Sequence, residues 1–374
     1  MTASSFKAFT ALVFLTGAWI SASASEVVFQ GSDDEAFKTF LNNAYSNIQV
    51  NVQKKVSVKL KLYDELAKIL AKVAFNDPCY TFRVEFKGSS YEGLKIGKPD
   101  EFDYGLVNDN WKGKISVLVD ATTPVGFGYA VQNIATCLDK FKVPGTKRVD
   151  ASKVRGHLRN LVEEAMLQLG MKGRFVKRPW EGGPAVTFEF VSGDPEFLYI
   201  SIDLAIGIDL PHWPPGARPR PAGVESAKAQ LVPKVKDENS AFWQISFAQV
   251  EKAIMENIDS DGGCRKKVLQ LAKYFKGKSV GRWHPLASYH LKTILLHMND
   301  EKRHSKDWAQ GMLVPRFKEL IDRLLKRLRT GILYSFFMPT QNLFEGKQAE
   351  LPGAIVSVND FLKTLRGNPQ ALLQ

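Results

Sequence analysis

The sequence predicts an α+β fold of two lobes, in which a lobe of mixed helices and strands precedes an all-helical lobe. Apolar residues recur at strand spacing in several short segments of the first part and at helical spacing in most of the last part. A segment rich in Pro and Gly, residues 209–223, separates these two patterns. We expect a leader at residues 1–25, a first lobe at 33–222 and a helical lobe at 223–374.

The elements follow from the same periodicities. Apolar residues at helical spacing from residue 33 to about 76 predict a long helix, either straight or kinked, and "NDP" predicts its end. The segments "YTFRVEF", "EFDYGLV" and "ISVLVD" predict strands, as do "PAVTFEF" and "LYISIDLAI", which read as a hairpin. A helix is expected between these two groups, at about 151–169. Helical patterns follow at 247–258, 266–275, 285–298, 314–330 and 358–366.

Composition and charge narrow the class of protein. With 374 residues, 44% hydrophobic and 24% charged, the chain has the composition of a globular protein and not of a disordered tail. The net charge of +12 favours a polyanionic partner. Charge alone does not choose among nucleic acid, nucleotide and anionic membrane.

The cysteines and the first residues bear on the compartment. Cys79, Cys137 and Cys264 are too few and too scattered for a disulfide framework, and none lies in a pattern with zinc spacing. The apolar segment 6–20, followed by "SASASE", resembles a signal peptide, and a mispredicted first exon would also explain it. Because we expect unpaired cysteines and find no N-x-S/T sequon, we prefer the cytoplasm to a secretory or membrane-associated route.

Three acidic residues suggest a metal site. In "PDEFDYGL", Glu101 and Asp103 are two apart on a predicted strand and therefore point to one face. Placing two anions side by side is costly unless a cation lies between them, and hard oxygen ligands suit Mg²⁺ or Mn²⁺. Asp203 lies in the middle of the apolar strand "YISIDLAI", where an unpaired acid is also costly. Three such acids could hold two metal ions.

A small turn precedes these acids. Gly88 and Ser89 end a predicted strand, so bare backbone N–H groups and a hydroxyl could bind the phosphates of a nucleotide. Taken separately, an ExD pair on a strand is usually a solvated edge and a Gly-Ser pair is usually a turn. Their occurrence together, with a later acid in mid-strand, favours the metal and phosphate interpretation.

The order of several segments carries a family resemblance. "GSSYEGLKIGKPDEFD", "GGPAVTFEF", "YISIDLAI", "WQISFAQVEKAI", "LASYHLKTILLHM" and "LRTGILYSFFMPTQNLF" occur in that order. Over residues 33–344 the sequence resembles cyclic GMP-AMP synthase (cGAS) and the animal cGAS-like receptors. The resemblance implies a bilobal nucleotidyltransferase fold, in which a mixed sheet carries the acids, a long spine helix backs it, and a helical lobe completes the nucleotide cleft.

The resemblance also implies a function. Such enzymes join two nucleoside triphosphates, here ATP and GTP, into a cyclic dinucleotide when a nucleic acid binds their basic back surface. This activity belongs to innate antiviral immunity, and the product is expected to be read by a STING-type receptor. Dimerisation on the activating ligand is a further expectation.

Individual residues match the motifs of the family. Gly88 and Ser89 resemble its phosphate-contacting pair, and Glu101, Asp103 and Asp203 resemble its metal ligands for two Mg²⁺ or Mn²⁺ ions. In the helical lobe, three residues resemble groups that contact the nucleotide: Lys273 on the triphosphate, Ser288 on phosphate, and Tyr289, whose ring stacks on a base.

Two departures from the family stand out. Gln244 in "WQISF" replaces an arginine of the family, while Ser246 is retained, which leaves the choice of bases open. The zinc insert of vertebrate cGAS is missing, because the interval "ENIDSDGGCRKK" has one cysteine. We therefore expect no zinc. In this the chain resembles zinc-less receptors, several of which respond to double-stranded RNA, so RNA is expected as activator rather than DNA.

Basic residues form three clusters along the chain. Each cluster alone is typical of a solvated face, but together they suit the duplex-binding groove that the resemblance implies. The residues expected to contact nucleic acid are Lys54, Lys55 and Lys59, then Lys147, Arg148, Lys153, Arg155 and Arg159, and finally Lys266 and Lys267.

Two other functions remain open. The chain could be a catalytically silent family member that works as a nucleic-acid-binding or developmental scaffold, although a scaffold needs no metal-binding acids. It could also be a template-independent polymerase that adds nucleotides to RNA ends.

Overall fold

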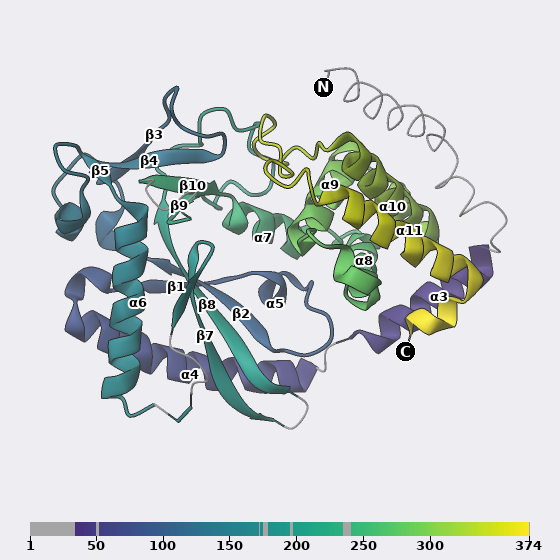
Figure 1. Ribbon diagram of the computed structural model, residues 1–374, viewed down its shortest axis with the longest axis horizontal. Coiled ribbons are helices and arrows are strands. Elements are labelled where there is room, and N and C mark those ends of the chain that lie inside the picture. Colours follow the sequence, from purple (N-terminus) through teal and green to yellow (C-terminus); the bar gives the residue numbers. More distant parts are fainter. Residues whose placement is uncertain are drawn as a thin grey trace, which may run out of the picture. The chain divides into compact units, whose positions relative to one another are not determined.

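The computed structural model describes residues 34–49, 52–171, 173–174, 179–194, 197–234 and 241–373, so the predicted leader lies outside it. The chain divides into two compact units (Figure 1). The sheet unit consists of Ile48–Lys266 and Tyr334–Leu343. The helical unit consists of α3 (Asp34–Asn47), Lys267–Leu333 and the residues from Phe344 onward.

A mixed sheet of ten strands forms the core of the sheet unit, as the predicted α+β fold requires. Seven strands follow the order β1-β2-β8-β9-β10-β4-β3, with β5 on β4 and β7 between β6 and β8. The β2–β8 pair is parallel, and the other described pairs are antiparallel. The strands are β1 Arg83–Lys87, β2 Glu101–Val107, β3 Ile115–Leu118, β4 Phe127–Gln132, β5 Arg148–Val149, β6 Trp180–Gly182, β7 Ala185–Asp194, β8 Phe197–Asp209, β9 Gln230–Val232 and β10 Phe242–Ser246.

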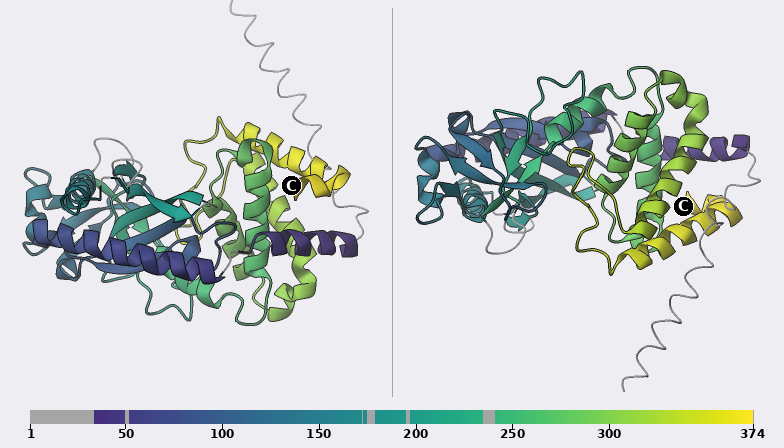
Figure 2. Two further views of the ribbon diagram at one scale, coloured as in Figure 1. Left: turned by 90° about the horizontal axis from the view of Figure 1, so that it is seen from below. Right: turned by 90° about the horizontal axis from the view of Figure 1, so that it is seen from above.

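Helices α4 (Val52–Asn76) and α6 (Ala151–Gln168) contact each other beside this sheet (Figures 1 and 2). On α4, the buried residues Leu62, Leu66, Ile69 and Val73 recur at helical spacing and form its apolar face. Tyr63 of α4 contacts the ring of Phe86 on β1. The short helix α5 (Ser89–Glu92) follows β1, and α7 (Ala248–Asn257) follows β10.

The helical unit is built around aromatic contacts. Phe275 of α8 (Arg265–Lys278) stacks on Phe40 of α3 at 5.8 Å between ring centroids. The same ring lies 5.8 Å from Phe317 of α10 (Leu313–Thr330) and 5.3 Å from Phe361 of α11 (Leu351–Gly367). Helix α9 (Ser288–Glu301) contacts α10. Among the described helices, these side chains join α3 to α8, α10 and α11.

The boundary expected at residue 222 differs from the structure. Strands β9 and β10 and helix α7 belong to the sheet unit, although we expected residues 223–374 to be helical. In "WQISF", Trp243 and Ile245 are buried while Gln244 and Ser246 are half-buried, which is the alternation of a strand. This strand period lies in a segment that we had interpreted only as a motif.

The long helix predicted from residue 33 to 76 is also two helices, α3 and α4, in different units. The carbonyl of Ile48 accepts a hydrogen bond at 3.0 Å from the backbone N–H of Gly97. This carbonyl is thereby bonded outside the helix, whereas a continuous helix would pair it with an amide of its own next turn.

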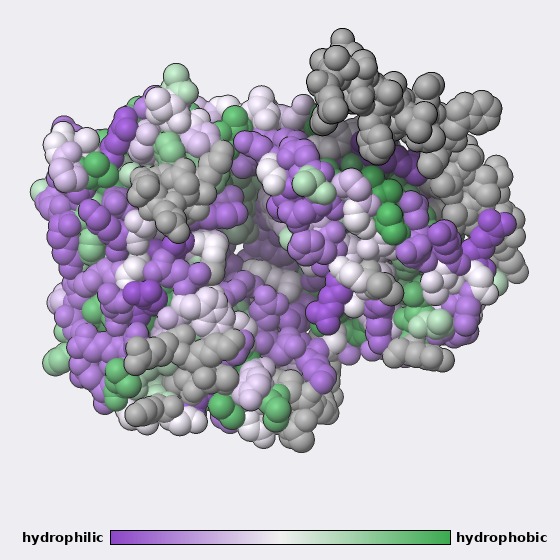
Figure 3. All heavy atoms as spheres, viewed as in Figure 1, coloured by the Kyte–Doolittle hydropathy of each residue, from purple (hydrophilic) through white to green (hydrophobic). Residues whose placement is uncertain are grey.

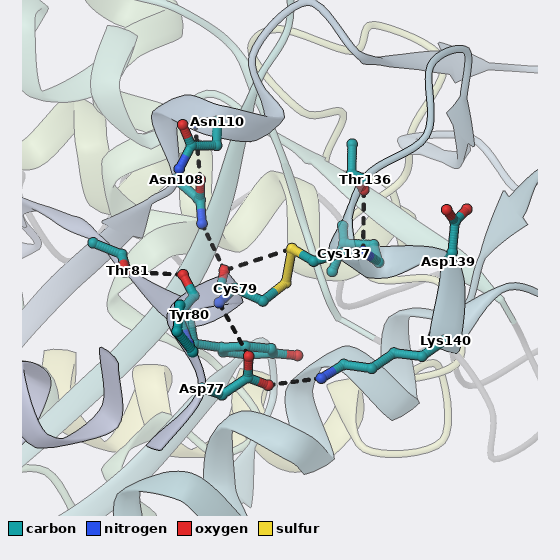
Figure 4. The surroundings of a disulfide bond; sticks show 12 residues. Asp77, Cys79, Tyr80, Thr81, Asn108, Asn110, Thr136, Cys137, Asp139 and Lys140 are labelled. Carbon is teal, nitrogen blue, oxygen red and sulfur yellow. Dashed lines mark hydrogen bonds and ion pairs between the residues drawn. A yellow bond between two sulfur atoms is a disulfide. The ribbon is translucent and has the colours of Figure 1, made fainter. Parts of the chain in front are cut away.

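A disulfide joins Cys79 and Cys137, whose Cα atoms are 5.7 Å apart (Figure 4). The expectation of unpaired cysteines was therefore wrong, and among the described residues only Cys264, which is buried, is not part of a disulfide. The number and spacing of the cysteines could not reveal this pair, because the two residues are 58 positions apart in the sequence. The cysteines therefore no longer support the preference for the cytoplasm, since disulfides persist mainly in oxidising compartments.

We expect the double substitution Cys79→Ser, Cys137→Ser to lower the free energy of unfolding by about 2–4 kcal/mol, because the cross-link restricts a long loop in the unfolded chain. Urea denaturation without reductant measures this. As a control, dithiothreitol should destabilise the wild type and leave the double variant unchanged. An unchanged wild-type midpoint in dithiothreitol would show that the bond contributes no stability.

On the face seen in Figure 3, hydrophilic side chains predominate among the described residues of the sheet unit, and apolar ones are scattered. Among the described residues, no helix combines the length and the hydropathy of a membrane span.

Candidate metal and nucleotide site

The parallel pairing of β2 with β8 brings the three acids together. Asp103 and Asp203 are direct register partners, and Glu101 lies two positions before Asp103, so all three point to one face of the sheet. Carboxylate oxygens of the three residues lie within 4.8 Å of one another. Sequence reasoning named these acids, and the structure places them in one cluster.

The cluster is electrostatically costly in the absence of a cation. Burial, followed by the charges of Glu101 and Asp203, raises the pKa of Asp103 to about 7. Burial also raises the pKa of Asp203, although the Thr187 hydroxyl donates a hydrogen bond to its carboxylate at 2.6 Å. Divalent cations bound by oxygen ligands would offset this repulsion, so the donor set fits Mg²⁺ or Mn²⁺.

Two residues that lie beside the cluster were not predicted from the sequence. Lys95, whose side chain is 10% exposed, lies 3.3 Å from Glu101 and 2.8 Å from Asp100. Glu92 is a buried fourth carboxylate, and its charge also raises the pKa of Asp103. Both lie in the segment between the Gly-Ser turn and β2, where no sequence period singles them out.

The Gly-Ser turn lies directly against the acids. Gly88 has φ of 71°, and a Cβ at this position would lie 1.7 Å from a carboxylate oxygen of Asp103. Only glycine permits both the backbone conformation and this close approach. The hydroxyl of Ser90 donates to the backbone carbonyl of Glu101 at 2.8 Å, which ties the turn to the first residue of β2. Ser89 is half-buried beside it.

The other predicted nucleotide residues are divided between the units. Gln244 and Ser246 on β10 share one face of the strand in the sheet unit. Lys273 lies within α8, and Ser288 and Tyr289 are the first residues of α9, exposed in the helical unit. The roles of these five residues in nucleotide binding stay predictions.

The basic residues of α4 differ in their surroundings. Lys59 donates a hydrogen bond to the backbone carbonyl of Ser90 at 3.1 Å, and its ammonium lies 3.9 Å from the centroid of the Tyr91 ring. Burial, followed by the charges of Lys55 and Lys252, lowers the pKa of Lys59 to about 8. Lys59 therefore contacts the turn that carries Gly88. The side chain of Lys54 lies outside the described part of the structure.

In the second cluster, Arg155 is occupied by protein partners. It forms an ion pair with Glu181 at 2.6 Å and donates to the carbonyls of Gly183 and Pro233. Arg148 lies 3.6 Å from the centroid of the Tyr129 ring and 3.2 Å from Asp120. These contacts leave fewer donors for phosphate than the sequence suggested. The more exposed members of the cluster are Lys147, Lys153 and Arg159.

The two residues of the third basic cluster belong to different units. Lys266 belongs to the sheet unit and Lys267 to the helical unit, where its ammonium donates to Asn42 at 2.7 Å and lies 4.6 Å from the centroid of the Tyr45 ring.

Comparison with known proteins agrees with this architecture. Residues 90–257 match the Mab-21 protein nucleotidyltransferase domain, and residues 264–355 match the Mab-21 protein HhH/H2TH-like domain. The chain is 27% identical over 296 residues to a cyclic GMP-AMP synthase of Sus scrofa, covering 71% of this chain and 58% of that protein. It is 27% identical over 312 residues to cyclic GMP-AMP synthase-like receptor 3 of Stylophora pistillata, covering 80% and 86%.

The chain therefore contains both domains of the Mab-21 family, and it is similar to cyclic GMP-AMP synthases and cGAS-like receptors. A cyclic GMP-AMP synthase-like receptor of Magallana gigas is also 27% identical, over 290 residues, covering 70% of this chain and 48% of that protein. The chain thus spans about half the length of several of its cGAS-like relatives. The matched nucleotidyltransferase domain contains all three acids, and Gly88 and Ser89 directly precede it.

Proposed function

We propose that the chain is a metal-dependent nucleotidyltransferase that joins ATP and GTP into a cyclic dinucleotide when a double-stranded nucleic acid binds to it. RNA is the expected activator rather than DNA, and innate antiviral defence is the expected setting. The observation that carries the proposal is the cluster of three carboxylates within 4.8 Å, on a nucleotidyltransferase domain and against the Gly88 turn.

Each group of the site has a proposed chemical role. Glu101, Asp103 and Asp203 would hold two Mg²⁺ or Mn²⁺ ions, which neutralise phosphate charge and activate a hydroxyl for in-line attack. The backbone at Gly88 and the Ser89 hydroxyl would bind the terminal phosphates of the donor nucleotide. A ribose hydroxyl attacks the α-phosphate, pyrophosphate leaves, and the linear dinucleotide rebinds for a second such step.

Other residues would hold the substrates. Lys273 and Ser288 would contact phosphates, and Tyr289 would stack on a base. Gln244 offers an uncharged donor and acceptor, so base selection by this chain would differ from that of relatives with an arginine. Zinc has no part in the proposal, because the disulfide occupies two of the three cysteines.

Purified chain incubated with labelled ATP and GTP, Mg²⁺ or Mn²⁺, and duplex RNA, duplex DNA or neither tests the proposal. We expect a phosphatase-resistant labelled dinucleotide with duplex RNA. No product under any condition would contradict the proposal and favour a silent binding protein. Label attached to RNA would favour a terminal polymerase. A cell-based assay with a STING-type receptor would test where the product acts, and sedimentation with duplex would test dimerisation.

We expect Lys55→Gln and Lys59→Gln to have different effects. Lys59 contacts the Ser90 carbonyl and the Tyr91 ring, so its loss should lower the rate of synthesis roughly tenfold while duplex affinity falls less than threefold. Lys55 has no such contact with the turn in the described structure, so its loss should mainly weaken duplex binding. Filter binding and initial rates measure the two effects, and equal behaviour of the variants would contradict this division.

A further inference from the structure

The surface of the sheet unit has a shallow cavity, widely open to solvent, with a volume of about 400 Å³, and it shares no residue with the acid cluster or the Gly88 turn. It lies between the 3₁₀ helix η3 (Cys137–Phe141) and the first turns of α6, and we refer to it as the α6 cavity. Its volume is within the range of small-molecule sites. The lining side chains that can carry positive charge are Lys140, Lys153, His157 and Arg159.

The walls of the α6 cavity are held in place by polar contacts with Asp77 and by contacts between rings. Asp77 accepts a hydrogen bond from Lys140 at 2.7 Å and lies 2.8 Å from Nε2 of His157. Burial alone would raise the pKa of Asp77, but these hydrogen bonds outweigh it and the pKa is lowered. The ring of His157 lies 4.9 Å from that of Tyr80 and 5.3 Å from that of Phe141.

The disulfide fixes the η3 wall of the cavity. Cys79 lies in η1 (Pro78–Tyr80), which Asp77 caps, and Cys137 lies in η3, which carries Lys140 (Figure 4). The covalent bond therefore connects the segment of the carboxylate to the segment of its lysine partner. A site whose charged groups are already held in place loses little freedom when a ligand binds.

The remaining cations have looser ion pairs. Lys153 lies 3.9 Å from Asp150, and Arg159 lies 3.6 Å from Glu181, both longer than a hydrogen bond. Arg159 also donates a hydrogen bond to the side-chain oxygen of Asn160 at 3.0 Å. Gly156 lies on the same wall, and a Cβ there would meet only a carboxylate oxygen of Glu181, at 3.6 Å. The glycine thus leaves the surface of α6 bare between cationic side chains.

We propose that the α6 cavity binds a small polyanion that carries several phosphate groups. A guanidinium and two ammonium groups around one cavity match such a ligand, because arginine binds phosphate oxygens in pairs and lysine supplies a mobile point charge. The phosphates could come from a free oligophosphate or from a nucleic-acid backbone, and the size of the cavity favours the former. The inference does not require that the chain synthesise a dinucleotide.

Calorimetric titration of the full chain with tripolyphosphate, without reductant and with EDTA, tests this inference. We expect Lys153→Gln with Arg159→Gln to raise the dissociation constant of the cavity roughly tenfold or more, because charge-assisted hydrogen bonds are lost. Gly156→Leu should have a similar effect at unchanged net charge, because it fills the cavity. Gly156→Ala and the double variant Lys68→Gln, Lys112→Gln, whose residues are exposed elsewhere in the unit, should stay within twofold of the wild type.

All these variants keep the Gly88 turn, so any phosphate binding there is the same in each of them. Differences in affinity between the variants therefore report on the α6 cavity. Circular dichroism checks that each variant is folded, and the two test variants change the site in independent ways. Wild-type affinity for tripolyphosphate in both test variants would overturn the inference. Weaker binding of duplex RNA alone, with tripolyphosphate unaffected, would also overturn it and assign the cations to nucleic-acid phosphates.

Discussion

Asp103→Asn is expected to reduce dinucleotide synthesis by roughly 10³-fold, because a metal-bound transition state is stabilised by several kcal/mol and each 1.36 kcal/mol corresponds to a factor of ten. Asparagine has the shape of aspartate but not its charge. The carboxylate of Asp103 lies at the centre of the cluster, since it is the register partner of Asp203 and lies against Gly88. Initial rates with saturating nucleotides and duplex RNA measure the loss.

Asp109→Asn is the matched control for this substitution. Asp109 follows the other end of β2 and is 61% exposed, so the same chemical change should leave the rate within twofold. Full synthesis by the Asp103→Asn variant would show that the metal assignment is wrong. Equal losses in both variants would point to a general effect on the strand and not to the cluster.

The acid cluster should also make the stability of the metal-free protein depend on pH. The pKa of Asp103 is raised to about 7 in the folded chain, while an aspartate in the unfolded chain titrates near 3.8. Between these values the folded state binds more protons, so the free energy of unfolding should fall as pH rises from about 4 to 7. A shift of this size corresponds to a loss on the order of 2–4 kcal/mol, complete above pH 7.

Chemical denaturation in EDTA at pH 5 and pH 8 measures this effect. The Asp103→Asn variant should be more stable than the wild type at pH 8, and the gain should shrink at pH 5. Added Mn²⁺ should stabilise the wild type at pH 8 and the variant much less, because the ion offsets the repulsion among the acids. If the stability of the wild type did not change relative to the variant between these pH values, the carboxylates would not be coupled as the structure indicates.

The acid cluster could be predicted because its signals are local. Glu101 and Asp103 share a face by the two-residue period of a strand, and Asp203 is conspicuous among apolar neighbours. Their meeting depends on the parallel pairing of β2 with β8, which lies far along the chain. No period in either strand specifies that partner, so the cost of an unpaired acid at Asp203 and the family resemblance were the signals that suggested it.

Other features depend on contacts that leave no pattern in the sequence. Lys95 lies against Glu101 because the segment after α5 folds back, and Lys59 contacts Ser90 because α4 passes the Gly88 turn. The Cys79–Cys137 bond forms because two 3₁₀ helices meet. Strands β9 and β10 are short, and the alternation of β10 lies in a segment that we had interpreted only as a motif. To predict any of these features, one must know which segments, distant in the sequence, lie side by side in the fold.

The pairing of β2 with β8 has a consequence for shortened forms of the protein. A splice variant or proteolytic fragment that ends before β8 would keep the Gly88 turn and two acids but lack the third, together with the strand that pairs with β2. Such a product would retain α4 and α6 with their lysines and arginines. Where it still folded, it would keep these basic residues but lack a complete acid cluster.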